Sequence, residues 1–141
     1  MLIFTTRIAN WLEDGLQLSV VREVVFINEQ QVPVELEWDE FDIDCVHALA
    51  VDSDGKPIGT ARCLPNGHIG RMAVLKEWRG KGVGRALLYR LIEEIRNQHT
   101  QQATLNAQTY AIGFYRKFGF QVVGKEFMDA GIPHVQMVLR L

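Results

Sequence analysis

The fold is decided by the stretch Arg79-Gly80-Lys81-Gly82-Val83-Gly84, which joins a predicted strand at residues 68–75 to a predicted helix at 83–98. The helix is predicted from apolar residues that share one face, namely Val83, Ala86, Leu87, Leu91, Ile92 and Ile95. The first amides of a helix have no partner within it, and the helix dipole adds partial positive charge there. Glycine lets a bulky anion approach the backbone closely. The stretch therefore predicts a phosphate-binding site.

Two common phosphate-binding motifs do not fit this loop. A Walker loop needs Ser or Thr after its lysine, whereas Gly82 follows Lys81. A dinucleotide-binding fingerprint that starts at Gly80 would need its third glycine at position 85, which is Arg85. A glycine-rich connection that binds nothing is the plain alternative, because such motifs often occur without a ligand. The loop residues alone leave this choice open.

Beyond the loop, the sequence predicts one domain over residues 1–141, of the α+β class with a mixed, mostly antiparallel sheet. Three strands joined by turn signals are expected to form an antiparallel meander at residues 45–51, 58–64 and 68–75. The other expected strands are 2–5, 103–108, 120–125 and 135–141, with a short helix at 111–118 that ends at Gly119.

A first helix is expected from Asp14, as its N-cap, to Gln30, because Pro33 cannot continue it. It is predicted from apolar residues at three- and four-residue steps, namely Leu16, Val20, Val21, Val24, Val25 and Ile27.

Composition excludes several protein classes. Lys and Arg number 15 and Asp and Glu 17, so the basic surplus of a general nucleic-acid binder is missing. No apolar run approaches the ~20 residues of a membrane span, and the start of the chain lacks a secretory-signal pattern. Cys45 and Cys63 cannot form a disulfide framework or a four-ligand zinc site, and we expect both to be buried. We therefore expect a cytoplasmic protein that binds no metal, membrane or nucleic acid.

The loop resembles the acetyl-CoA-binding motif of the GNAT acyltransferases, which reads Gln or Arg, two residues, Gly, one residue, then Gly or Ala. Here the motif is Arg79-x-x-Gly82-x-Gly84. Residues 105–108 and 111–120 are similar to the family's fifth strand and fourth helix. A narrower similarity to the ElaA/YjcF-like branch lies in residues 22–30, 47, 69–71 and 129–134. The resemblance implies a single-domain GNAT-like fold and an acetyl-CoA-dependent N-acetyltransferase.

The resemblance also implies the roles of individual residues. The backbone of the strand before the loop would pair with the pantetheine arm, and the loop would hold the pyrophosphate. Tyr115 matches the family's general-acid tyrosine, which protonates the leaving thiolate. As alternatives, Tyr115 could simply line the channel, and Asn106 could satisfy local backbone groups. The implied acetyl-CoA-binding residues are Met72, Ala73, Val74, Arg79, Gly80, Lys81, Gly82, Val83, Gly84, Arg85, Asn106, Phe114 and Tyr115.

Transfer to an amine also needs a base, because a free alkylamine has a pKa near ~10 and is mostly protonated at neutral pH. Glu29 and His47 are the first candidates, and Asp39, His68 and His134 are further options. Histidine suits base chemistry at neutral pH, although a lone histidine in a strand is more often structural. A chain of waters to bulk solvent could replace any single base.

An acidic run offers a clue to the acceptor. It comprises Glu35, Glu37, Asp39, Glu40, Asp42 and Asp44. Its field would attract a cationic amine, although such a run is most often a solvated loop. The predicted acceptor is a small cationic primary amine. A non-catalytic acyl-CoA-binding sensor and a protein N-terminal or lysine acetyltransferase stay open as alternatives, as does a homodimer.

Overall fold

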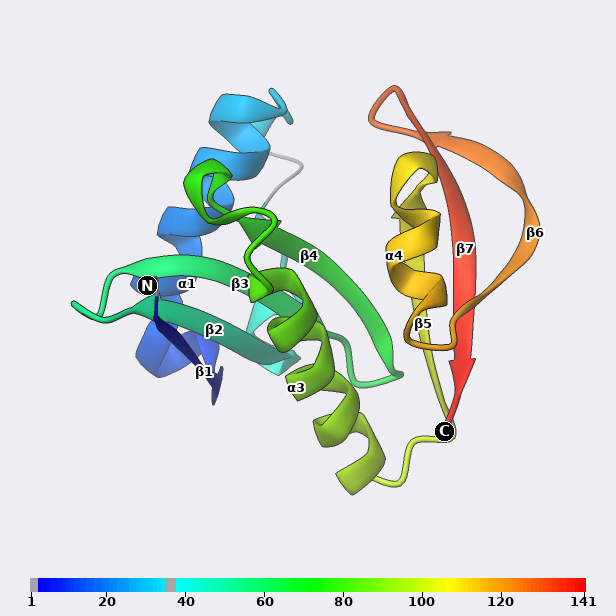
Figure 1. Ribbon diagram of the computed structural model, residues 1–141, viewed down its shortest axis with the longest axis horizontal. Helices are drawn as coiled ribbons and strands as arrows, with labels where there is room; N and C mark the ends of the chain where they lie inside the picture. Colours follow the sequence, from blue (N-terminus) through cyan, green and yellow to red (C-terminus); the bar gives the residue numbers. More distant parts are fainter. Residues whose placement is uncertain (1–2, 35–37) are drawn as a thin grey trace.

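The strands of the protein form one seven-stranded sheet in the order β1-β2-β3-β4-β5-β7-β6 (Figure 1). The computed structural model describes residues 3–34 and 38–141. The strands are β1 (Phe4–Ala9), β2 (Val46–Asp52), β3 (Pro57–Cys63), β4 (His68–Val74), β5 (Gln102–Gln108), β6 (Gln121–Asp129) and β7 (Ile132–Arg140). The helices are α1 (Trp11–Arg22), the π-helix η1 (Glu23–Glu29), α3 (Val83–Asn97) and α4 (Ile112–Arg116), with 3-10 turns η2 (Asp42–Asp44), η3 (Lys76–Trp78) and η4 (Thr109–Ala111).

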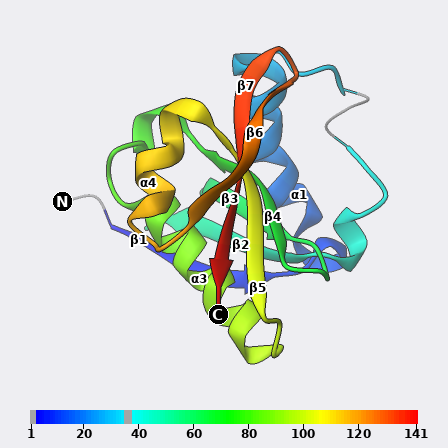
Figure 2. The same cartoon turned by 90° about the vertical axis from the view of Figure 1, so that its right-hand side faces the viewer.

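Helices cover both faces of this sheet. Figure 2 shows α1 on one face and α3 and α4 on the other. Strands β2, β3 and β4 pair antiparallel in chain order, so the predicted meander is confirmed. The β4–β5 pair is parallel, and β5, β7 and β6 pair antiparallel beyond it. The predicted α+β class with a mixed sheet is confirmed.

The first strand and first helix start elsewhere than predicted. Strand β1 begins at Phe4 and runs to Ala9 at the sheet edge, where polar residues hide the strand pattern; Leu2 lies outside the described residues. Helix α1 begins at Trp11, because the Asn10 side chain accepts a hydrogen bond of 2.9 Å from the Glu13 amide. The predicted cap, Asp14, instead lies in the first turn.

The buried side of the first helical segment also differs from the predicted one. Leu16, Val20 and Val24 are exposed, at 87%, 50% and 40%. Val21 and Val25 are buried, as predicted, and Leu18 and Arg22 are buried with them. Their spacing is helical, but the stripe contains an arginine, so a search for apolar periodicity selects a neighbouring face.

The last hairpin is longer than predicted. Strand β6 continues to Asp129, and β7 already begins at Ile132. A tight turn joins them, in which Ala130 and Gly131 both have positive φ, 50° and 77°. The second half of β6 was missed because its residues are exposed and do not alternate. The short helix is also shorter than expected, since 3-10 turn η4 precedes α4.

Helix α3 anchors the glycine-rich loop to the sheet. Its buried residues are Val83, Leu87, Leu88, Leu91, Ile92 and Ile95, so Leu88 joins the predicted face, while Ala86 is half-buried. Gly59 on β3 allows this contact, because a Cβ there would lie 2.9 Å from Val83 Cγ1. Cys45 and Cys63 are buried, as predicted. Among the described residues, no helix is long and apolar enough to cross a membrane, and no three His, Cys, Asp or Glu side chains form a metal-binding group.

Candidate active site

The site begins where the sheet separates. Strands β4 and β5 pair at His68–Thr104 and Ile69–Leu105, at the start of β4. Just beyond, β4 has an irregularity in its pairing with β3, and Arg71 there has a φ of 49°. Left-handed backbone at a residue other than glycine is uncommon and marks a constrained position. Beyond this irregularity β4 diverges from β5 (Figure 1), and the residues between the two strands line a cleft.

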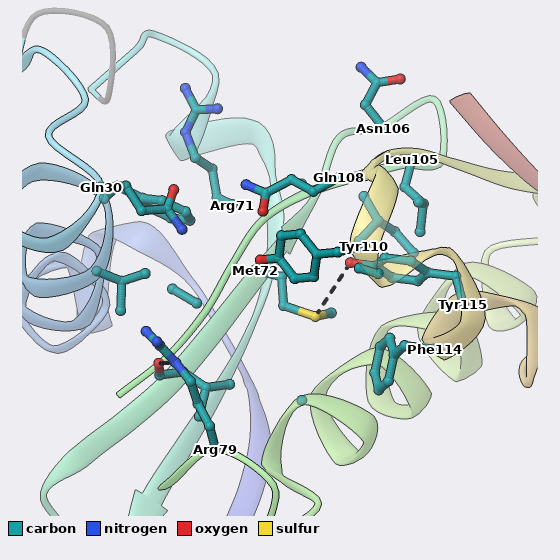
Figure 3. Close-up of a pocket in the computed structure, with 18 of the residues that line it drawn as sticks. Gln30, Arg71, Met72, Arg79, Leu105, Asn106, Gln108, Tyr110, Phe114 and Tyr115 are labelled. Atoms are coloured by element: carbon teal, nitrogen blue, oxygen red, sulfur yellow. Dashed lines mark hydrogen bonds between the residues drawn. The ribbon is translucent and has the colours of Figure 1, made fainter. Parts of the chain in front are cut away.

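A pocket of about 800 Å³ fills this cleft. Its walls come from η1, β4, the glycine-rich loop, β5, α4 and the β6–β7 hairpin. Figure 3 shows Gln108 and Tyr110 pointing into it from the β5 side and Gln30 facing them from the end of η1. One cavity therefore combines the predicted phosphate-binding loop with the separated strand edges.

The loop has the conformation that an anion site needs. Gly80 and Gly82 have φ values of 75° and 88°, which glycine adopts without strain, and a Cβ at either would meet nothing within 4 Å. Gly82 is the N-cap of α3 and carries no side chain to occupy the first amides of the helix. Arg85 also lines the pocket, whereas Lys81 is exposed and does not.

Arg79 ties the loop to the opposite wall. Its guanidinium makes two hydrogen bonds to the Glu29 carboxylate, of 2.7 and 2.8 Å, and its Nε donates to the Val74 carbonyl at 3.0 Å. The hydrogen bond from Arg79 holds the pKa of the Glu29 carboxyl below its usual value. Glu29 thus lies in the pocket as predicted, but as a paired carboxylate, which is a weaker base than a free one.

Tyr115 lies on the other side of the pocket. Its hydroxyl is 4.0 Å from Met72 Sδ, the contact drawn in Figure 3. Its ring meets Phe114 and Phe120 with centroids 5.1 and 6.0 Å apart. Burial raises the pKa of Tyr115 to about 12, so its phenol keeps its proton at neutral pH. Most of the residues predicted to bind acetyl-CoA lie around the same cavity: Met72, Ala73, Val74, Arg79, Gly80, Gly82, Val83, Gly84, Arg85, Asn106, Phe114 and Tyr115.

The structure does not bring His47 to the pocket. His47 is buried on β2, its Nε2 donates to the Asp42 carbonyl at 2.8 Å, and its ring lies 5.6 Å from that of Trp11. Burial lowers its pKa. A neutral, enclosed imidazole with this partner is a structural residue, and its predicted role as base gains no support.

Part of the acidic run also has a structural role. Asp42 binds Arg22 at 2.7 Å and Arg62 at 2.9 Å, and Asp39 binds Arg62 at 2.7 Å and Arg71 at 3.3 Å. The hydrogen bond from Arg62 holds the pKa of Asp39 below its usual value. Paired carboxylates attract an external cation less than free ones do. Glu35 and Glu37 lie outside the described residues.

Several pocket residues were not predicted from the sequence. They are Gln30, Arg71, Gln108, Tyr110, Asp129 and Ile132. Strand alternation could have indicated Gln108, which shares a face with the predicted Asn106. Nothing in the sequence pattern distinguishes Tyr110, which stands 81% exposed on η4.

Comparison with known proteins agrees with this geometry. The family described as "Acetyltransferase (GNAT) domain" matches residues 24–141. The N-acetyltransferase YjcF of Bacillus subtilis, itself uncharacterised, is 42% identical over 122 residues, which cover 84% of this chain and 86% of YjcF.

Solved structures share the whole fold. An acyl-CoA N-acyltransferase of Pseudomonas aeruginosa superposes with a TM-score of 0.83 at 28% identity, covering 98% of this chain and 99% of the other. Escherichia coli ElaA superposes with a TM-score of 0.83 at 27% identity, with the same coverage. The chain belongs to the GNAT acetyltransferase family, in its ElaA/YjcF-like branch, and is an acyltransferase that uses an acyl-CoA donor.

Proposed function

We propose that the protein transfers an acetyl group from acetyl-CoA directly to a small primary amine. The observation that carries this proposal is that a single pocket contains a glycine-rich helix start, a separated strand edge and a buried tyrosine hydroxyl. Acetyl-CoA needs these three features in this order: the helix start for its diphosphate, the strand edge for its extended, amide-bearing arm, and the tyrosine for its thioester sulfur.

The pocket residues fit acetyl-CoA. Gly80 and Gly82 leave open space where a side chain would stand, so phosphate oxygens can reach the first amides of α3. Arg85, which lines the same pocket, would add positive charge there. The backbone of β4 from Met72 to Val74 faces the cleft and would pair with the pantetheine amides. The donor supplies an activated acetyl group at the inner end of this arm.

The proposed acid is Tyr115. A phenol donates a proton to a leaving thiolate without carrying a charge itself, and the raised pKa keeps the proton in place until the thiolate forms. The hydroxyl lies 4.0 Å from Met72 Sδ on β4, where the pantetheine arm would end.

The proposed acceptor is a small amine that arrives protonated, as primary amines do at neutral pH. Asp129 lines the pocket and is exposed, so its carboxylate can attract an ammonium group. Support for a strongly cationic acceptor is smaller than the sequence suggests, because Asp39 and Asp42 are paired with arginines.

Acceptor screening tests the proposal. Purified protein is incubated with acetyl-CoA and separate panels of neutral, cationic and anionic amines, while released thiol is detected and CoA binding is measured by calorimetry. Thiol release that depends on an amine supports the proposal. Binding of acetyl-CoA without release in any panel would instead support the non-catalytic sensor.

A further inference from the structure

His134 on β7, one of the further candidate bases, lies in the wall of the pocket, and its ring is fixed in one tautomer. The residue is 8% exposed, and its Nδ1 lies 2.7 Å from the Ile132 carbonyl oxygen. A carbonyl oxygen only accepts hydrogen bonds, so Nδ1 carries the hydrogen. In the neutral ring, Nε2 therefore keeps a free lone pair.

That lone pair is accessible. Nε2 has no hydrogen-bond partner within residues 3–34 and 38–141. Every fully buried side-chain nitrogen or oxygen among these residues does have a partner, so Nε2 is not fully buried. Because His134 lines the pocket, we infer that Nε2 is accessible from there. Phe127 stacks on the ring, with centroids 5.9 Å apart and planes 23° apart, which fixes its orientation.

Strand register places His134 beside Gln108, a residue of the pocket wall. His134 lies directly opposite Gln108 on β5, so both side chains lie on one face of the sheet. Gln108 and His134 line the same pocket as Met72 and Tyr115. Met72 is the residue that contacts the Tyr115 hydroxyl.

The other candidate bases are less well placed. The carboxylates of Glu29 and Asp39 are bonded to arginines, and His47 lies outside the pocket lining. His68 also lines the pocket, with its Nδ1 2.8 Å from Thr104 Oγ1, but it lies where β4 and β5 are still paired, four residues before Met72 along β4.

We propose that His134 is the general base that deprotonates the acceptor amine, an inference that rests on the proposed N-acetyltransferase function. Nε2 takes one proton from the ammonium group, directly or through one water, and later releases it to solvent. The freed nitrogen lone pair forms the C–N bond to the acetyl carbon as the C–S bond breaks. Tyr115 gives its proton to the sulfur and regains one from the amide nitrogen, so the products are the amide, CoA thiol and one proton.

The test compares wild type with His134→Gln, which fills similar space but cannot take up the proton. We expect kcat/KM for the amine to fall on the order of 10²-fold near neutral pH, with CoA affinity unchanged. The wild-type rate should form a plateau with pH near neutrality, because the base takes its proton from the ammonium form of the amine. The rate of His134→Gln should instead keep rising about tenfold per pH unit, because it follows only the free-amine fraction.

Two further variants and one spectrum complete the test. His99→Gln, at an exposed turn just after α3, is the matched control and should behave as wild type. Added imidazole should restore part of the rate to His134→Ala, which loss of a packing contact would not allow. Nitrogen NMR of the wild type should show His134 as the Nδ1–H tautomer, whether or not the variants fold. The other charged groups of the pocket, Glu29, Arg71, Arg79, Arg85 and Asp129, are present in every variant.

The outcomes separate the two proposals. An unchanged pH profile in His134→Gln, an Nε2–H tautomer, or loss of the wild-type plateau in His68→Gln alone would overturn the base assignment and leave the acetyltransferase standing. A wild-type protein that binds acetyl-CoA but acetylates no amine would overturn both.

Discussion

At the scale of single residues, Tyr115 provides a direct test of the acid step. Tyr115→Phe removes only the hydroxyl, while the ring contacts with Phe114 and Phe120 persist. We expect kcat to fall on the order of 10²-fold, because general-acid catalysis contributes about that much. The dissociation constant of CoA should stay within about twofold of the wild-type value, since the proposed role of the hydroxyl brings it to the sulfur of CoA alone. Steady-state kinetics with calorimetry measures both. Unchanged turnover would leave Tyr115 as a wall of the channel.

Substitution of Glu29 distinguishes a catalytic base from a carboxylate that only pairs with Arg79, two roles that the sequence could not separate. Its carboxylate opposes an incoming diphosphate and occupies the Arg79 guanidinium. We expect Glu29→Gln to tighten CoA binding about two- to fivefold, as removal of a half-exposed ion pair is worth roughly 0.5–1 kcal/mol. We expect kcat to fall less than about threefold. Glu126→Gln, the same change on exposed β6, is the control. A large fall in kcat, on the order of 10²-fold, would make Glu29 the base after all.

At the scale of elements, the loop before α3 depends on main-chain groups rather than on side chains. Gly82 has a φ of 88° and open space above it. Gly82→Asp places a negative charge where the phosphates must approach, in a backbone conformation that aspartate tolerates. We expect the CoA dissociation constant to rise at least about tenfold, with a melting temperature near that of the wild type. Gly55→Asp is a matched control, because Gly55 has a φ of 82° in a turn after β2. Equal CoA affinity in Gly82→Asp would contradict binding at this loop.

Elements whose function lies in the backbone were the easiest to predict from the sequence. Glycine spacing located the loop, and apolar periodicity located α3 almost to the residue. Elements whose buried face carries a charge were harder, since the stripe on α1 includes Arg22. His134 shows the same limit at the site. The sequence offers it among five possible bases, but its place opposite Gln108 depends on the pairing of β5 with β7, two strands far apart in the chain. Its tautomer depends on the exact position of the Ile132 carbonyl, which a sequence pattern does not give.

At the scale of the whole molecule, a buried charge network connects the first helix to the pocket. Asp42 on η2 binds Arg22 at the end of α1 and Arg62 on β3, and Asp39 continues the network to Arg71 in the pocket wall. The network explains why the chain retains charged residues inside its core. Asp39 and Asp42 of the acidic run therefore position the pocket wall, in addition to contributing negative charge near the pocket.

Asp42→Asn tests whether this network holds the molecule together. The substitution removes a carboxylate that is 3% exposed from two arginines, of which Arg22 is 1% and Arg62 8% exposed. The substitution takes one anionic partner from each of two buried arginines while Asp39 still binds Arg62, so the free energy of unfolding should fall by about 3 kcal/mol, the lower end of the range for a broken buried ion pair. Denaturant unfolding followed by tryptophan fluorescence measures it, because Trp11 and Trp38 both stack on Arg22. Asp44→Asn, two residues away and exposed, should change stability by less than about 0.5 kcal/mol. Equal stabilities of the two variants would show that the arginines find sufficient compensation elsewhere and that the acidic run acts mainly through its field.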